Sequence, residues 1–383
     1  MPAARHGLNL QTAAAVARRG GRRLVILCSH ACEPEEAGEA IMHSDPRVRP
    51  TILNVRDYQI PVRLECDRIA EDWSSWDYDT AIKRNLGLAL AYSMGWKTVL
   101  FLDDDVRQLR REHLGRMLAA LAGGAGSRAA GWAFDDYPDH SIACHGYRLS
   151  DQIRYGRQEP FIGGGALAVA IRGRLPFFPT VYNEDWLFLY PLLAEGRRSV
   201  ARAGSMLQLP FDPFAHPAHA GKQEFGEVLA EGLFRLLHRS GAHDPLVRGG
   251  PATEVGFWKE MTDRRRRFLR ETWTDLQSDP KASAEAECLR IALETLDDGW
   301  ADALAEWFCA WQGDLVRWHD FIRELESSRP RRAANRWTVA MARLDLAERV
   351  WRIPPRRVTG ARRPPGSRPR GRGPGRMVRS VLM

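Results

Sequence analysis

The sequence has no long apolar run and no CxxC pair of cysteines. Its apolar stretches all fall short of the roughly 18 residues of a membrane span, so we expect no transmembrane segment. The six cysteines are scattered, which disfavours both a disulfide scaffold and a zinc site. These absences predict a cytoplasmic protein, with peripheral contact at the inner face of a membrane left open as an alternative.

Lysine is also scarce, with five lysines against 51 arginines. The formal net charge of +8 comes from the end of the chain, where ten arginines and no acidic residue lie between Arg352 and Met383. The rest of the chain therefore carries a net charge near −2, which disfavours a basic nucleic-acid-binding body. We predict that the Pro-, Arg- and Gly-rich residues 353–383 form a disordered basic tail that contacts anionic partners.

Short apolar strands and helices alternate in the first part of the chain. The predicted elements are strands at 24–28, 51–55 and 99–102, with helices at 33–44 and 80–95. Such alternation is typical of a parallel sheet with right-handed crossovers. The sequence therefore predicts an α/β domain over residues 22–221, preceded by an N-terminal arm at 1–21.

From residue 222 the alternation gives way to a helical pattern rich in tryptophan. Helices are predicted at 222–239, 253–276, 282–297, 299–325 and 332–351. A run of basic residues, Arg264 to Arg267, is expected on a solvated helix face. We therefore expect a C-terminal α-helical region over residues 222–352.

The stretch from Val99 to Asp105 joins a buried strand to three carboxylates. Adjacent ionised carboxylates repel one another unless a cation or solvent compensates them. The ends of strands in α/β sheets are also where ligands bind. Oxygen ligands at this place indicate a site for Mg²⁺ or Mn²⁺ together with phosphates. The alternative is a solvated turn whose aspartate caps the next helix.

Three further motifs accompany the aspartates in a fixed order. Lys83-Arg84-Asn85 opens a helix, Gly163-Gly164-Gly165 begins an apolar strand, and Asn183-Glu184-Asp185-Trp186 stands at a helix start. Together with Asp103 to Asp105, this order and spacing resemble the family 2-type glycosyltransferases of the GT-A fold. The resemblance covers about residues 22–220.

The resemblance implies a role for the residues of each motif. Asp103 and Asp105 match the outer residues of the family's DxD-type motif, which would hold Mn²⁺ or Mg²⁺ against the phosphates of the donor. Asp103 would also face the ribose, and Asp104 lies beside it as a further donor contact. The resemblance also implies that Arg84 and Asn85 contact the donor. Gly164 and Gly165 would border the donor sugar.

The resemblance also implies a catalytic base. Asp185, with Glu184 before it, matches the carboxylate pair that removes the proton of the acceptor hydroxyl in inverting members. His216 is chosen over His219 as a late histidine ligand of the metal. Ser29 and Asn54 lie at the ends of the first two strands, and their positions alone suggest contact with the nucleotide base.

Each of these residues also has a plain structural interpretation. Arg84 could lie on a solvated helix face, and acidic residues at 184 and 185 could simply charge a helix N-terminus. A loop histidine is often only exposed. The motifs together favour the functional interpretation over these alternatives.

The predicted function is transfer of a sugar from a nucleotide-diphospho-sugar, by default a UDP-sugar, to an acceptor hydroxyl with inversion at the anomeric carbon. The alternatives are a retaining enzyme of the same fold, a sugar nucleotidyltransferase, and a non-catalytic binder of RNA or anionic surfaces through the tail. The acidic segment from Ser29 to Glu36 disfavours the nucleotidyltransferase, because it lacks glycine and would repel a triphosphate.

Overall fold

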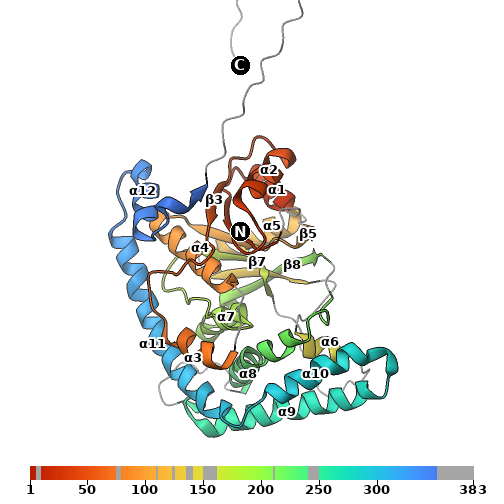
Figure 1. Ribbon diagram of the computed structural model, residues 1–383. Coiled ribbons are helices and arrows are strands. Elements are labelled where there is room, and N and C mark those ends of the chain that lie inside the picture. Colours follow the sequence, from red (N-terminus) through yellow and green to blue (C-terminus); the bar gives the residue numbers. More distant parts are fainter. Residues whose placement is uncertain are drawn as a thin grey trace, which may run out of the picture. The chain divides into compact units, whose positions relative to one another are not determined.

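The computed structural model describes residues 1–5, 10–74, 79–108, 111–122, 126–134, 141–149, 162–209, 212–239 and 250–351 (Figure 1). Within these residues no helix is both long enough and apolar enough to cross a membrane. The predicted disordered tail at 353–383 lies outside the described residues.

Two sheets form the α/β part, and the first has the order β1-β2-β3-β9. Its strands are β1 (Pro2–Ala3), β2 (Val25–Cys28), β3 (Thr51–Asn54) and β9 (Val350–Trp351). The first three are parallel and β9 is antiparallel to β3. The strands predicted near 24–28 and 51–55 are confirmed, whereas β1 replaces part of the predicted N-terminal arm.

The second sheet has the order β4-β7-β6-β8-β5. Its strands are β4 (Thr98–Leu102), β5 (Val106–Gln108), β6 (Ala129–Phe134), β7 (Gly163–Ala170) and β8 (Val200–Gln208). β6 and β8 are parallel, but β7 is antiparallel to both β4 and β6, and β5 is antiparallel to β8. The expectation of a wholly parallel sheet is therefore wrong, because the chain enters β7 from the end at which β4 and β6 finish.

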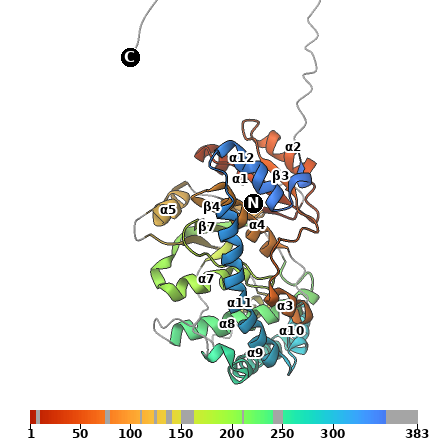
Figure 2. The same cartoon turned by 90° about the vertical axis from the view of Figure 1, so that its left-hand side faces the viewer.

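Helices surround the two sheets (Figures 1 and 2). In the first half of the chain they are α1 (Leu10–Gly20), α2 (Pro34–Ser44), α3 (Glu65–Ser74), α4 (Thr80–Met94), α5 (Arg111–Ala122), α6 (Ile142–Leu149) and α7 (Glu184–Glu195). In the second half they are α8 (Ala218–Arg239), α9 (Val255–Gln277), α10 (Ser283–Thr295), α11 (Trp300–Ser327) and α12 (Ala333–Arg343). Short 3₁₀ turns lie at 197–199, 251–253, 280–282 and 347–349. The α/β fold with a C-terminal helical region is thus confirmed.

Helix α4 lies close against the sheet and ends where the sequence predicts. Gly95 adopts the left-handed backbone (φ 69°) that stops a helix and favours glycine. A Cβ atom on Gly87 would lie 2.6 Å from the Phe101 ring, so a glycine here lets α4 approach β4. This close approach brings the polar residues at the start of α4 to the end of β4.

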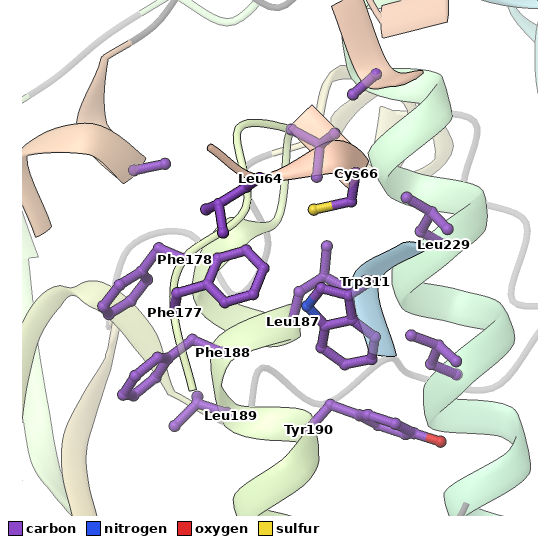
Figure 3. Close-up of a cluster of buried hydrophobic side chains, with 14 of the residues drawn as sticks. Leu64, Cys66, Phe177, Phe178, Leu187, Phe188, Leu189, Tyr190, Leu229 and Trp311 are labelled. Carbon is purple, nitrogen blue, oxygen red and sulfur yellow. The ribbon is translucent and has the colours of Figure 1, made fainter. Parts of the chain in front are cut away.

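The C-terminal helices share a hydrophobic core with the α/β part. The ring of Trp311 in α11 lies 6.1 Å from the ring of Tyr190 in α7 (Figure 3). The ring of Trp318, also in α11, lies 6.1 Å from that of Phe177. Tyr190, Trp311 and Trp318 are all buried. Because burial of each large side chain contributes about 2 to 3 kcal/mol, this shared core joins the helical region firmly to the sheets. The boundary at residue 221 stays a prediction.

A buried ion cluster holds α8 against α9. The Arg265 guanidinium lies 2.6 Å from a carboxylate oxygen of Glu224, 3.3 Å from Glu227 and 2.7 Å from Glu231. The Arg265 side chain has no solvent exposure. The expectation of a solvated face is therefore wrong for Arg265, because three glutamates at helical spacing on α8 compensate its charge.

We expect Arg265→Leu to lower the free energy of unfolding by about 3 to 5 kcal/mol, because it leaves buried glutamates without their cation. Exposed Arg267 on the same helix is the matched control, and Arg267→Leu should change stability by about 0.5 kcal/mol or less. Urea unfolding followed by tryptophan fluorescence measures both. Equal stability of the two variants would contradict the role of the cluster.

Candidate active site

Arg84 joins three of the four predicted motifs. Its guanidinium donates to the Asp103 carboxylate at 3.0 Å and to Glu184 at 2.5 Å. The arginine comes from α4, the aspartate follows β4, and the glutamate begins α7. Only 3% of the Arg84 side chain is exposed, so the alternative of a solvated helix face is wrong for this residue.

Burial and charge shift the pKa values in this cluster. Burial opposes the charge of Arg84, but Asp103 and Glu184 more than compensate, so the pKa of Arg84 is raised. Burial raises the pKa of Glu184 to about 7, although the Arg84 charge acts in the opposite direction. Burial also raises the pKa of Asp185, again against the effect of Arg84. A carboxyl group with a raised pKa is a better proton acceptor than an ordinary one.

The glycine motif, Gly163-Gly164-Gly165, reaches the same cluster through backbone hydrogen bonds. The Gly164 N–H donates to one Asp185 oxygen at 2.5 Å, and the Trp186 N–H donates to the other at 2.8 Å. A Cβ atom on Gly164 would lie 2.5 Å from the Arg84 guanidinium, so a glycine is needed for this approach. The Asp103 N–H donates to the Gly165 carbonyl at 2.9 Å, which ties β4 to β7 at the site.

Helix α8 and the chain before α7 set the direction of the carboxylate pair. Asn183 has a left-handed backbone (φ 64°), which turns the chain into α7 so that Glu184 and Asp185 lie in its first turn. A Cβ atom on Gly226 of α8 would lie 2.1 Å from the Tyr182 carbonyl oxygen. The Trp186 ring lies 4.9 Å from that of Phe234, also in α8. Trp186 therefore packs against the helical region.

The three consecutive aspartates have different partners. Asp103 binds Arg84, whereas Asp104 accepts from the backbone N–H groups of Ala4 and Arg5 at 2.8 and 3.0 Å. The Arg5 guanidinium lies 2.9 Å from an oxygen of Asp104 and 2.9 Å from an oxygen of Asp105. Burial, with the neighbouring Asp103, raises the pKa of Asp105 to about 6, against the charge of Arg5.

These aspartates fit a divalent cation by their chemistry. Their oxygens are the ligands that Mg²⁺ and Mn²⁺ prefer. In the described part of the chain, no group of three or more His, Cys, Asp or Glu side chains is arranged to hold a metal. One or two carboxylates with phosphate ligands are the usual arrangement for Mg²⁺. Asp103 and Asp105 are the residues that would hold the ion.

His216 is not brought into such a group. It lies in the loop before α8, where its ring is 5.2 Å from that of His219. Its role as a metal ligand stays a prediction. The sequence alone gave no flanking pattern that tied either histidine to the aspartates.

The other residues predicted to contact the donor, Ser29, Asn54 and Asn85, differ in their hydrogen bonds. Ser29 is buried after β2, and its hydroxyl has no hydrogen-bond partner in the described structure. Asn54 accepts from the Arg56 N–H at 3.1 Å and closes a turn after β3. Asn85 donates to the Phe178 carbonyl at 2.7 Å and accepts from the Phe178 N–H at 2.8 Å. The Asn85 amide thus joins two chain segments, which is a structural role, and its contact with the donor stays a prediction.

Two charged residues at the site were not predicted from the sequence. Arg5 belongs to the predicted N-terminal arm, and no motif marks it. Lys83 belongs to the motif Lys83-Arg84-Asn85, but the resemblance implies no role for it. It is buried, donates to the Ala3 carbonyl at 3.0 Å and lies 2.9 Å from an Asp79 oxygen. Only the fold reveals the contacts of Lys83 with Ala3 and of Arg5 with Asp104, because these partners lie 80 or more residues away along the chain.

Comparisons with known proteins give a distant structural similarity. No model of a protein family matches the chain, and no curated protein matches it. Among solved structures, glucosyl-3-phosphoglycerate synthase from Mycobacterium tuberculosis with phosphoglyceric acid has 15% identity and a TM-score of 0.36, covering 63% of this chain and 79% of that one. The same enzyme with Mn²⁺, uridine diphosphate and phosphoglyceric acid gives 15% identity, a TM-score of 0.36, and coverage of 63% and 78%. Its complex with Mg²⁺ and uridine diphosphate gives 14%, 0.34, and coverage of 63% and 78%.

We expect Asn85→Ala to lower the free energy of unfolding by about 2 to 3 kcal/mol, because the Phe178 N–H and carbonyl then stay buried without partners. Asn54→Ala is the matched control, and its loss of one turn hydrogen bond should cost about 1 kcal/mol or less. Thermal and urea unfolding of both variants test this difference. A smaller loss for Asn85→Ala than for Asn54→Ala would contradict the structural role.

Proposed function

We propose that this chain is a metal-dependent glycosyltransferase that moves a sugar from a nucleotide-diphospho-sugar, by default a UDP-sugar, to an acceptor hydroxyl. One observation carries the proposal: Arg84 bridges Asp103 and Glu184 while Gly164 binds Asp185. Four motifs that are separated by as many as 100 residues thus meet at the end of β4. The proposal rests on these residues and not on the distant structural matches.

The donor would lie where β4 ends, beside Asp103 and Asp105. A Mn²⁺ or Mg²⁺ ion bound there would neutralise the negative charge that develops on the nucleoside diphosphate as it leaves the sugar. Arg84 holds Asp103 and Glu184 in place and adds a fixed positive charge near the donor. Gly163 to Gly165 would border the donor sugar, with the Arg84 guanidinium in the space that a side chain on Gly164 would take.

We assign the general base to Asp185. Its carboxylate is oriented by two backbone N–H groups, which leaves each oxygen a further lone pair for the acceptor hydroxyl. Glu184 is engaged by Arg84, which makes it the less suitable proton acceptor of the pair. Removal of the hydroxyl proton by Asp185 lets the acceptor oxygen attack the anomeric carbon from the face opposite the leaving group, with inversion.

A panel of UDP-, GDP- and dTDP-sugars with Mn²⁺ or EDTA tests the proposed reaction. We expect metal-dependent release of one nucleoside diphosphate, with at least about a hundredfold loss in Asp105→Ala, because that variant lacks the carboxylate nearest the cation. Release of pyrophosphate from a nucleoside triphosphate would favour a nucleotidyltransferase instead. Absence of binding and turnover with every donor would refute the proposal.

We expect Asp185→Asn to lower kcat by about 10²- to 10⁴-fold, as loss of a general base does. In the native protein, kcat/KM should fall with decreasing pH at values above the ordinary range of an aspartate, because the pKa of Asp185 is raised and only its ionised form accepts a proton. Glu195→Gln, at the other end of α7, is the control that should keep full activity. If Glu184→Gln loses activity and Asp185→Asn does not, then the base is Glu184.

A further inference from the structure

Residues 2–5 lie across the place where the donor is proposed to bind. Strand β1 is parallel to β2, and its pairs are Pro2 with Leu27 and Ala3 with Cys28. Beyond it, the Ser29 N–H donates to the Ala3 carbonyl at 3.1 Å and the Ala31 N–H donates to the Ala4 carbonyl at 3.0 Å. This segment therefore continues past the end of β2, along the edge at which Ser29 was predicted to meet the nucleotide base.

The same segment also binds the aspartates after β4. The N–H groups of Ala4 and Arg5 donate to one Asp104 oxygen, and the Arg5 guanidinium lies 2.9 Å from both Asp104 and Asp105. One positive group thus serves two adjacent carboxylates, as a divalent cation would. Asp105 cannot give the same lone pairs to Arg5 and to a metal ion.

The covered residues are those that a donor would need. The Ser29 hydroxyl is buried without a hydrogen-bond partner in the described structure, and the residue's own N–H is occupied by Ala3. Lys83, next to Arg84, holds the segment down through the Ala3 carbonyl. The Arg5 end of the ion pair is open to water, since 59% of that side chain is accessible to solvent, against 12% of Asp104 and 16% of Asp105. A guanidinium that is already solvated loses little when it leaves the pair, so a ligand can displace it from the carboxylates.

We propose that residues 2–5 act as an internal occupant of the donor site, with Arg5 in competition with the divalent cation for Asp105. This inference rests on the proposed function. Binding of the cation and a nucleoside diphosphate requires Arg5 to leave the carboxylates and the segment to withdraw from Ser29. At low concentrations of cation and donor, residues 2–5 therefore remain in the site, and higher concentrations displace them.

The test measures Mn²⁺ binding by electron paramagnetic resonance of the free ion, with UDP present, on the full chain tagged at its C-terminal end. Arg5→Ala should bind Mn²⁺ about 3- to 10-fold more tightly than the native protein, because a competing ion pair is gone. Arg5→Lys should lie between them. Arg18→Ala is the matched control, since Arg18 is similarly exposed, at 51%, and pairs with the carboxylate of Asp45, away from the site. It should bind Mn²⁺ as the native protein does.

Hydrogen exchange gives an independent readout of the withdrawal. In the native protein, the N-terminal peptide that reports on residues 3–5 should exchange faster once Mn²⁺ and UDP are added, because Asp104 no longer holds the Ala4 and Arg5 N–H groups. Unchanged or slower exchange at saturating ligand would refute the proposal.

The outcomes separate this inference from the proposed function. If the native protein binds Mn²⁺ and UDP, Asp105→Ala does not, and Arg5→Ala equals the native protein, the inference fails and the function stands. If neither the native protein nor Arg5→Ala binds Mn²⁺ or UDP, both fail.

Discussion

A buried guanidinium between two carboxylates is the interaction on which the candidate site depends. Arg84 has almost no access to water, so its charge must be compensated by Asp103 on one side and Glu184 on the other. Because these partners come from β4 and α7, satisfying the charge also fixes the distance between the end of the sheet and the first turn of the helix. Gly164 has no side chain, and this leaves room for the Arg84 guanidinium beside β7, while the Gly164 N–H donates to Asp185.

The helical region contributes to the same geometry from the other side. Trp311 packs near Tyr190, and Phe234 packs on Trp186, so α7 is held between the sheet and the C-terminal helices. The close contact of Gly226 with the Tyr182 carbonyl fixes the chain just before Glu184. The buried Arg265 cluster keeps α8 in the position that makes these contacts possible. Positioning of the carboxylate pair is thus a physical role for the tryptophan-rich helices.

Local pattern predicts much of the fold and the main site residues, and long-range pairing explains the rest. The apolar runs of β2, β3 and β4 and the helical periods of α4, α7 and α11 are readable because they depend on neighbouring residues alone. Strand β8 is hard to recognise, since Gly204, Arg202 and two alanines weaken its apolar alternation. Arg265 and Arg5 look like ordinary surface arginines in the sequence. Their partners lie 34 or more residues away, and only the fold brings the charges together.

A crystal structure of the native protein with Mn²⁺ and UDP, with anomalous data collected at the manganese edge, tests the central claim most directly. The account predicts one anomalous peak at the Asp105 carboxylate, with the diphosphate beside it and Arg84 still bound to Asp103 and Glu184. A peak away from the end of β4, or UDP bound elsewhere while Asp103 and Asp105 contact no ligand, would contradict it.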